Sequence, residues 1–341
     1  MLNLENTAIN VDDANNLKNV IWIDVRCPRE YQKGHFPKSI NIPLFSDTHY
    51  EEIGKLYRKS GQDAAFNLGI KYLEVSKNNI LDQLSKLKTK EVVIYCARGG
   101  MRSKGFEKLS SEAGYKVNRI NNGYKSIRNY TLDAFKVHRE IVILAGSTGT
   151  GKTNLLKKME SQGLNIINLE GLANHRGSAF GDVGLSEQPT QQQFENNLSL
   201  DWLSTDKDAI VYIESESRKI GKLVVPENLW IQMKLGFYLK INMDINRRIK
   251  NLVNDYGIYS KKIIEDRICK ISKKLGGQYT KEALNLLYEN KLNDLCQLLL
   301  NNYYDKMYAI AYEKRESLKS TIQISSESES EIIERVIKKH G

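Results

Sequence analysis

Two loops in this chain of 341 residues carry residue types that bind anions, and they indicate different chemistries. The loop 96–103 begins with a cysteine and contains two glycines and two arginines. The loop 146–153 is rich in glycine and ends in lysine and threonine. An apolar run precedes each loop, at 91–95 and at 141–145. The first loop therefore offers a nucleophilic thiol to an anionic substrate, and the second offers a cradle for a diphosphate or triphosphate.

Cys96 opens the first loop, between a predicted strand and a helix expected from about Ser103. In such a turn the backbone N–H groups converge, and together with the helix dipole they bind anions and lower the pKa of a thiol. Cys96 is therefore the candidate catalytic nucleophile. The residues expected to bind its anionic substrate are Arg98, Gly99, Gly100, Met101 and Arg102. The same spacing is the C-x5-R pattern of cysteine phosphatases, which stays open as an alternative for this region.

The second loop fits the pattern G-x-x-x-x-G-K-[ST] and has a predicted strand before it and a predicted helix after it. Its backbone N–H groups wrap phosphate oxygens, Lys152 neutralises them, and the Thr153 hydroxyl can hold Mg²⁺. The pattern does not distinguish a diphosphate ester from a nucleotide. The diphosphate-binding residues predicted here are Gly146, Ser147, Thr148, Gly149, Thr150, Gly151, Lys152 and Thr153.

Polar residues after two neighbouring predicted strands are candidates to complete the phosphate site. Glu214 and Glu216 follow the strand 209–213, and Arg218 is available for anion contact. His175 and Arg176 lie in the polar, glycine-containing segment 170–181, which follows another predicted strand. This segment is expected to be a substrate loop near the phosphates. The alternatives are ordinary strand-end carboxylates and a plain glycine-rich connection.

Strands and helices alternate along most of the chain, which indicates parallel sheets covered on both faces and an α/β fold. Strands are predicted at 20–25, 91–95, 116–120, 141–145, 165–169 and 209–213, with more extended structure at 230–233 and 236–241. From residue 244 the pattern is helical and basic. The predicted organisation is a parallel-sheet domain at 1–130, a P-loop α/β domain at 137–243, and a helical, basic region at 244–341.

The composition restricts the class of protein. The net charge of +10 favours a polyanionic partner such as nucleic acid. No apolar run approaches the roughly 20 residues of a membrane helix, and the first residues lack a signal peptide, so no membrane association is predicted and the cytoplasm is expected. The four cysteines form neither a CxxC pair nor a zinc pattern.

The N-terminal part resembles a rhodanese domain. The matching residues are Ile23-Asp24-Val25-Arg26 with Pro28, Glu30-Tyr31, Gly34-His35-Phe36-Pro37, Asn41-Ile42-Pro43 and the Cys96 loop. A rhodanese domain followed by a P-loop domain is similar to the tRNA 2-selenouridine synthase family. Its more specific stretches here are 43–47, 96–103, 170–181 and 214–221, and 275–278 and 303–305 fit its helical C-terminal part.

The resemblance implies a transferase that acts on tRNA carrying 2-thiouridine at the wobble position. The thiocarbonyl sulfur is geranylated from geranyl diphosphate, and selenium from selenophosphate then replaces the S-geranyl group. The rhodanese resemblance implies that Cys96 is the carrier, here of selenium as a selanyl-sulfide, and no tightly bound cofactor is expected. From phosphate chemistry alone we hypothesise that the P-loop holds the diphosphate of geranyl diphosphate, with Mg²⁺ as a further ligand at Thr153. No obligate protein partner is expected.

The basic C-terminal helices would then form the tRNA surface. The candidates are Arg247, Arg248, Lys250, Lys261, Lys262, Lys273 and Lys274. A sulfurtransferase fused to an ATP-dependent kinase is the alternative function for the whole chain.

Overall fold

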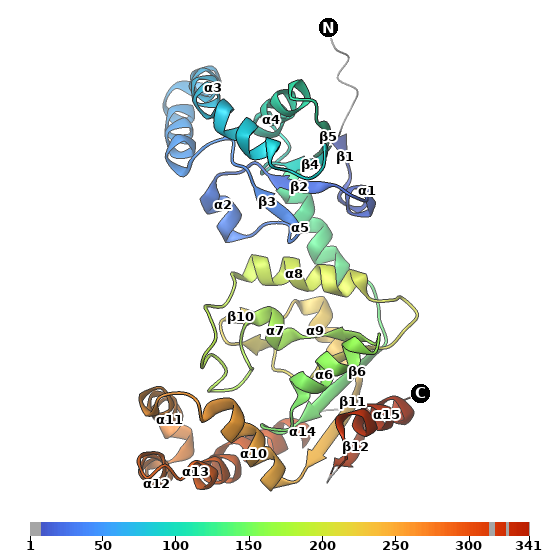
Figure 1. Cartoon of the computed structure of the whole chain (residues 1–341), viewed down its shortest axis with the longest axis vertical. Helices are drawn as coiled ribbons and strands as arrows, with labels where there is room; N and C mark the ends of the chain where they lie inside the picture. The colour runs from blue at the N-terminus through green and yellow to red at the C-terminus, as the bar shows by residue number, and fades with distance from the viewer. Residues whose placement is uncertain (1–7, 314–317, 325–326, 341) are drawn as a thin grey trace. The chain divides into compact units, whose positions relative to one another are not determined.

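The computed structural model describes residues 8–313, 318–324 and 327–340, and it divides into two compact units (Figure 1). Unit 1 comprises residues 1–134 together with 190–200, and unit 2 comprises 135–189 together with 201–341. Apart from residues 190–200, the two regions expected at 137–243 and 244–341 thus lie in one unit. The predicted α/β class is confirmed, because both large sheets consist of parallel strands with helices on their faces.

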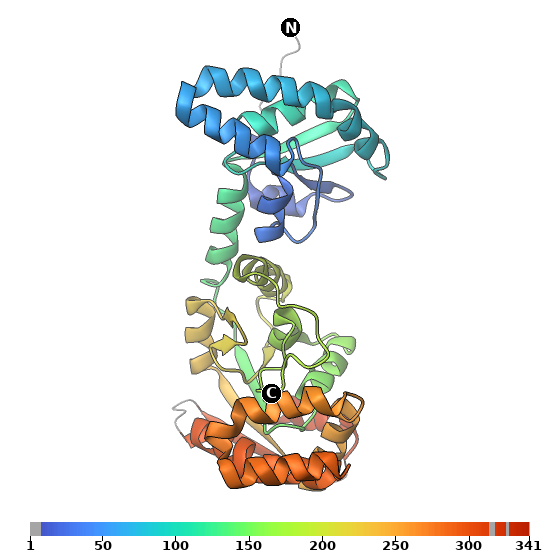
Figure 2. The same cartoon turned by 90° about the vertical axis from the view of Figure 1, so that its left-hand side faces the viewer.

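Unit 1 is built on a five-stranded parallel sheet with the order β1-β5-β4-β2-β3. Its elements are β1 (Ala8–Ile9), α1 (Val11–Asn16), β2 (Ile21–Asp24), α2 (Pro28–Lys33), β3 (Ser39–Asn41), α3 (Asp47–Ser85), β4 (Glu91–Tyr95), α4 (Met101–Glu112), β5 (Lys116–Ile120) and α5 (Gly123–Ala134). The long α3 changes course at Gly61, whose φ of 84° is not helical (Figure 2).

Alternate side chains of the central strands of unit 1 enter two separate cores, as the two-residue period of a strand requires. On β4, Val92 and Ile94 pack with α3 and α4, whereas Val93 and Tyr95 pack with α1 and α5. Leu200 of α8 (Gln191–Ser204) joins the second core. Cys96 continues the first set, so the strand alternation directs its side chain toward α4.

Unit 2 contains a second five-stranded parallel sheet with the order β12-β11-β6-β8-β7. Its sheet and covering elements are β6 (Ile141–Gly146), α6 (Lys152–Ser161), β7 (Asn165–Ile167), α7 (Leu169–Ala173), β8 (Val211–Glu214), the hairpin β9 (Lys219–Ile220) and β10 (Leu223–Val224), α9 (Glu227–Leu235), β11 (Phe237–Met243), β12 (Lys319–Ile324) and α15 (Glu329–His340). Helices α6 and α15 pack together on one face of this sheet. The carboxyl end of β6, at the centre, carries the phosphate loop.

The remaining helices of unit 2 form their own apolar cluster beside the phosphate loop. They are α10 (Ile245–Tyr256), α11 (Lys261–Leu275), α12 (Gly277–Tyr288), α13 (Leu292–Leu299) and the π-helical turn η1 (Leu300–Tyr304). Helix α14 (Asp305–Glu313) follows η1. The predicted helical region is therefore present, but it ends in β12, which pairs with β11 and returns the chain to the sheet. No helix among the described residues has the length and apolar character needed to cross a bilayer.

Two expectations about elements differ from the structure. The segment 230–233, expected to be extended, belongs to helix α9, which begins after Pro226 with Glu227 in its first turn. These residues favour a helix start, and a short apolar run alone does not distinguish strand from helix. The predicted strand at 165–169 ends at Ile167, and α7 begins at Leu169.

Candidate active site

Cys96 lies at the carboxyl end of β4, immediately before the loop that leads into α4. Its side chain is buried, with 3% of its surface exposed, and its Sγ donates to Ser103 Oγ at 3.3 Å. Ser103 Oγ in turn donates to the Gly100 carbonyl at 3.0 Å. The thiol therefore faces the first turn of α4, where helix N–H groups are available to an anion.

The Cys96 loop is held by the start of α5 at Gly123. The amides of Tyr124 and Lys125 donate to the carbonyls of Cys96 and Ala97 at 2.7 and 3.1 Å. Gly123 has φ of 55°, and a Cβ atom there would lie 2.2 Å from the Cys96 carbonyl oxygen and 2.7 Å from the Gly99 nitrogen. Glycine is therefore required at this position both for its conformation and for its lack of a side chain.

The two arginines of this loop have different surroundings. Arg98 and Met101 are exposed. Arg102 forms an ion pair with Glu30, with a second contact of 3.2 Å, and its guanidinium lies 4.9 Å from the centre of the Tyr50 ring. Burial acts to lower the pKa of Arg102, but the hydrogen bond and charge of Glu30 raise it overall. Of the two arginines, Arg98 is thus the one exposed to solvent, whereas Arg102 is held by Glu30 in the wall of the loop.

The loop 146–153 has the backbone shape that cradles phosphate oxygens. Gly149 and Gly151 adopt φ of 86° and 72°, and the amide of Thr150 donates to the Ser147 carbonyl at 3.2 Å. Helix α6 begins at Lys152, so its N-terminal N–H groups face the loop. A Cβ at Gly149 would lie 2.8 Å from the Arg248 carbonyl oxygen, which shows how closely α10 supports the loop.

Lys152 and Thr153 meet a cluster of carboxylates. Lys152 Nζ donates to the Gly146 carbonyl at 2.7 Å, and Thr153 Oγ1 donates to Glu170 Oε2 at 2.8 Å. Glu214 Oε1 accepts from the Glu170 amide at 2.7 Å. Burial acts to lower the pKa of Lys152, but Tyr308, Glu216 and the other two carboxylates raise it overall, so the ammonium form is favoured.

Glu214 and Glu216 are held in surroundings that disfavour their charged forms. Burial above all, and then the neighbouring Glu170, raises the pKa of each to about 8. Glu214 is fully buried and its Oε2 has no hydrogen-bond partner. An unpaired buried oxygen beside two further carboxylates indicates a place for a cation or a proton.

These residues fit Mg²⁺ in the way that phosphate sites usually hold it. Mg²⁺ typically takes one or two carboxylate or hydroxyl oxygens and completes its shell with water and substrate phosphates. Thr153, Glu170 and the free oxygen of Glu214 supply such oxygens. The described residues contain no group of three or more histidine, cysteine, aspartate or glutamate side chains arranged to hold a metal ion.

The segment 170–181 packs against the carboxylates. A Cβ at Gly177 would lie 2.1 Å from Glu216 Oε2, so the backbone of this loop covers that side chain. His175 Nδ1 accepts from the Gly177 amide at 3.1 Å, and burial lowers the pKa of His175. Arg176 donates to the Val183 carbonyl at 2.9 Å and lies 5.5 Å from the centre of the Tyr256 ring. Both side chains brace the loop.

Glu170 and Arg248 are the site residues whose roles differ most from expectation. Glu170 was expected only as the start of the segment, yet it contacts Thr153 of α6, because α6 packs against β7. Arg248, expected at the tRNA surface, is 6% exposed. It donates from Nε to the Thr148 carbonyl at 2.9 Å and forms a bidentate pair with Asp305. The expected tRNA contact is wrong for Arg248, because its side chain supports the phosphate loop.

A wide cavity of about 880 Å³ adjoins the carboxylates within unit 2. Its aromatic lining comes from Trp230, Tyr238, Tyr303, Tyr304 and Tyr308, and Lys234, Arg218 and Glu216 add charge. Arg218 lines this cavity and forms an ion pair with Glu227. Lys152 Nζ lies 5.7 Å from the centre of the Tyr308 ring, which places the aromatic wall beside the phosphate site.

Comparison with known families gives two matches that together span most of the chain. Residues 139–340 match the family described as "tRNA 2-selenouridine synthase AAA domain", and residues 7–130 match "Rhodanese-like domain". The boundary between these matches lies near the end of α5.

Several curated relatives that match most of the chain are named tRNA 2-selenouridine synthase. The tRNA 2-selenouridine synthase of Shewanella frigidimarina (strain NCIMB 400) is 33% identical and covers 88% of this chain and 90% of its own. The proteins of that name from Psychromonas ingrahamii and Pseudomonas syringae pv. syringae are 31% and 32% identical, and they cover 86% and 88% of this chain and 88% and 90% of their own. A solved structure of the N-terminal domain of an ATP/GTP binding protein from Clostridium difficile 630 is 37% identical over 37% of this chain and 98% of its own, with a TM-score of 0.35.

Proposed function

Because this chain belongs to the tRNA 2-selenouridine synthase family, we propose that it is a transferase that converts 2-thiouridine at the wobble position of tRNA to 2-selenouridine. The proposed route has two steps, geranylation of sulfur and exchange of the S-geranyl group for selenium. The observation that carries it is the presence on one chain of a buried cysteine loop and a complete phosphate loop. These loops match the two classes of reagent, selenophosphate and geranyl diphosphate.

In the first step, the thiocarbonyl sulfur of the nucleoside attacks C1 of geranyl diphosphate. The S–C bond forms as the C–O bond breaks, diphosphate leaves with the electron pair, and the N3 proton of the base is released. Lys152 and the N–H groups at the start of α6 stabilise the charge that develops on the leaving oxygens. Mg²⁺, when bound beside Thr153, would supply further neutralisation of the diphosphate.

The wide cavity supports a place for the nucleoside in this step. Single-stranded nucleotides are bound by stacking on aromatic rings and by cations along the backbone. Trp230 and Tyr303 offer rings, and Lys234 offers charge, beside the carboxylates of the phosphate site. A base flipped out of an anticodon loop has the size and chemistry for this cavity, and the exposed lysines of α10 and α11 then suit the flanking phosphates.

In the second step, selenium already arrives reduced and nucleophilic in selenophosphate. Its addition at C2 forms a C–Se bond and breaks the C–S bond, so that geranylthiol leaves and no electrons are exchanged. Cys96 then attacks phosphorus: the S–P bond forms, the P–Se bond breaks with selenium keeping the pair, and water hydrolyses the phosphocysteine. The C-x5-R spacing and the Ser103 hydroxyl beside Cys96 favour this role. A selanyl-sulfide on Cys96 would instead need an oxidant and then a reductant.

The proposal is tested by nucleoside mass spectrometry on 2-thiouridine tRNA incubated with geranyl diphosphate, with and without selenophosphate. Wild type is expected to give the geranylated nucleoside, and 2-selenouridine only when selenophosphate is present. Lys152→Ala is expected to lower the geranylation rate by 10²-fold or more, the order of magnitude for loss of one charge-stabilising group. Its control is Lys157→Ala, an exposed lysine on the same helix.

Cys96→Ser is the matched test of the second step. This variant is expected to geranylate normally and to accumulate the geranylated or selenophosphorylated nucleoside, whereas Cys269→Ser, at an exposed cysteine, is expected to behave as wild type. Full selenation by Cys96→Ser would remove Cys96 from the mechanism. No product in any tube, together with ATP turnover and cyanide-dependent sulfur transfer, would favour the sulfurtransferase–kinase alternative.

A further inference from the structure

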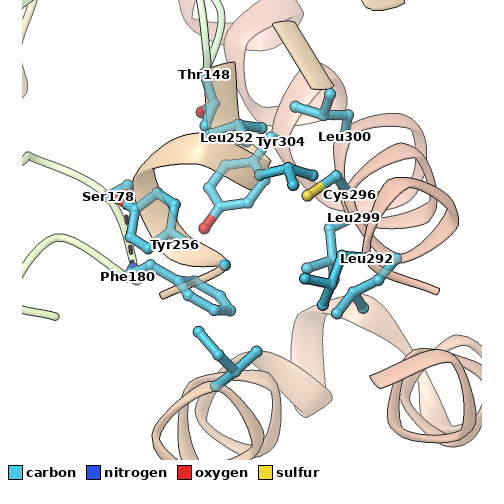
Figure 3. A pocket seen from close by; sticks show the side chains of 14 residues that line it. Thr148, Ser178, Phe180, Leu252, Tyr256, Leu292, Cys296, Leu299, Leu300 and Tyr304 are labelled. Carbon is cyan, nitrogen blue, oxygen red and sulfur yellow. Dashed lines mark hydrogen bonds between the residues drawn. The ribbon is translucent and has the colours of Figure 1, made fainter. Parts of the chain in front are cut away.

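A second, almost wholly apolar cavity lies behind the tip of the phosphate loop (Figure 3). Phe180 and Tyr256 line one side, and Leu292, Leu299 and Cys296 line the other. The cavity has about 60 Å³ of space for the centres of water-sized groups. A single water needs roughly 10–15 Å³ by that measure. The cavity therefore accommodates about five such groups, which is the size of one five-carbon isoprene unit.

The phosphate loop itself forms part of this cavity. Thr148, at the tip of the loop, lines it, and the Thr148 Oγ1 atom is buried without a hydrogen-bond partner. Leu252 lies beside Thr148 in the lining (Figure 3) and against Gly149, since a Cβ there would be 3.1 Å from Leu252 Cγ. An anion held by the loop would thus have apolar side chains directly beside it.

A π-helical turn joins the apolar wall to the loop. Leu300 and Tyr304, the two ends of η1, both line the cavity, and the Asp305 amide donates to the Leu300 carbonyl in the five-residue spacing of a π-helix. Asp305 also holds Arg248, whose guanidinium binds the Thr148 carbonyl. Such turns are rare and occur mostly at functional sites. Here the turn fixes the cavity wall and the phosphate loop relative to each other.

This apolar cavity and the wide aromatic cavity share Ser178 and Tyr304 in their linings. A ligand with an anionic head in the loop and an apolar tail behind it would therefore have the head-to-tail junction close to the aromatic cavity. A packing gap confined to the helical cluster would not be lined by the tip of the phosphate loop or by residues that also line the aromatic cavity.

We propose that the apolar cavity binds the hydrocarbon chain of a prenyl diphosphate whose diphosphate lies in the loop 146–153, and that the small volume of the cavity limits the length of the chain. This inference rests on the proposed geranyl transfer and specifies where the donor binds. One isoprene unit fits inside the cavity, and the unit nearest the diphosphate lies at its mouth, toward Ser178 and Tyr304.

The first test measures binding without tRNA, by calorimetry with inorganic diphosphate and with geranyl diphosphate. Wild type is expected to bind geranyl diphosphate at least tenfold more tightly than inorganic diphosphate. Cys296→Phe fills the cavity and is expected to remove that difference while leaving the affinity for inorganic diphosphate unchanged. Cys269→Phe, at an exposed position on α11, is the control and is expected to retain it. An unchanged tenfold preference in Cys296→Phe would overturn the inference.

The second test enlarges the cavity and keeps the inference open to contradiction if Cys296→Phe fails to fold. Leu299→Ala is expected to raise kcat/KM for farnesyl diphosphate relative to geranyl diphosphate by about tenfold over the wild-type ratio. An unchanged ratio in Leu299→Ala would refute the assignment even though wild type still transfers geranyl. If wild type transfers no prenyl group at all, the proposed function fails, and binding by calorimetry still decides the cavity separately.

Discussion

The carboxylates around Lys152 are the residues on which the chemistry of the phosphate site depends most directly. Glu214 and Glu216 were expected from their place at a strand end, and that reasoning needs only the sequence. Glu170 was not assigned a role, because its contact with Thr153 depends on α6 packing against β7, which no local pattern reveals. Arg248 was misplaced for a related reason: a basic residue on an amphipathic helix is usually exposed, whereas Asp305 pairs with this one inside the fold.

The raised pKa values of Glu214 and Glu216 predict that the free protein loses stability as the pH rises. Each carboxyl binds its proton more tightly in the folded protein than in the unfolded chain. This proton binding contributes fully to stability below the ordinary pKa of 4.5, and the contribution is lost as the pH rises to the folded-state pKa of about 8. Glu216→Gln, which stays neutral, is expected to have a higher Tm than wild type above about pH 8 and a similar Tm at about pH 5. Thermal unfolding at both pH values checks this.

The control for this comparison is Glu289→Gln, at an exposed carboxylate paired with Lys291. It is expected to show no such pH-dependent gain. A Tm of Glu216→Gln that lies below wild type by the same amount at both pH values would mean that Glu216 is charged and favourably bound throughout this range.

At the scale of elements, the sequence was most informative where one strand and one helix flank a loop. The apolar runs at 91–95 and 141–145 form β4 and β6, and both loops are followed by helices. Elements whose identity depends on a distant partner were harder to predict. Strand β12 exists because it pairs along its length with β11, and α9 replaces an expected extended segment because its helix-start residues outweigh a short apolar run.

Because the start of helix α5 lies against the Cys96 loop, we expect one added methyl group at Gly123 to have a large effect on that loop. Gly123→Ala would bring Cβ within 2.2 Å of the Cys96 carbonyl oxygen, so the loop must move. Gly114→Ala is the control, because its φ is also positive, at 82°, but no atom lies within 4 Å of the new Cβ. Both variants carry roughly 1–2 kcal/mol of backbone strain.

Only Gly123→Ala is expected to lower selenation, by tenfold or more, while geranylation continues. Denaturant unfolding and nucleoside mass spectrometry measure the two effects. Equal selenation rates in the two variants, at equal stability, would show that the shape of the Cys96 loop tolerates displacement.

At the scale of the whole molecule, the fold class followed from the alternation of strands and helices, but the assignment of residues 190–200 did not. These residues lie in sequence between elements of unit 2, yet they pack with unit 1. Asn196 is 1% exposed; its amide donates to the His35 carbonyl at 2.7 Å and to the Tyr124 hydroxyl at 3.0 Å, and its oxygen accepts from Arg128 at 2.6 Å. A polar stretch of glutamine and asparagine gives no sign of such burial.

Asn196→Ala is expected to destabilise unit 1 by about 1–3 kcal/mol, because buried partners lose their hydrogen bonds. Hydrogen exchange at the amides of β4 would localise the effect to this unit. Asn197→Ala is the neighbouring control, since Asn197 is less buried and its oxygen accepts only from Gln193 in the same helix among the bonds that the described residues show. Equal exchange rates in the two variants would contradict a stabilising role for this segment.

The interleaving of residues 190–200 with unit 1 has a consequence for how the chain is made. During synthesis the ribosome releases the first 134 residues well before the segment that carries Asn196. We therefore expect unit 1 to remain incompletely folded while the phosphate loop and β7 are synthesised. A protein cut between the two family matches, near residue 135, would keep Cys96 and its sheet but would lose the segment 190–200, whose Leu200 packs against the core that contains Tyr124. During synthesis, unit 1 is thus expected to complete its folding only after part of unit 2 has been made.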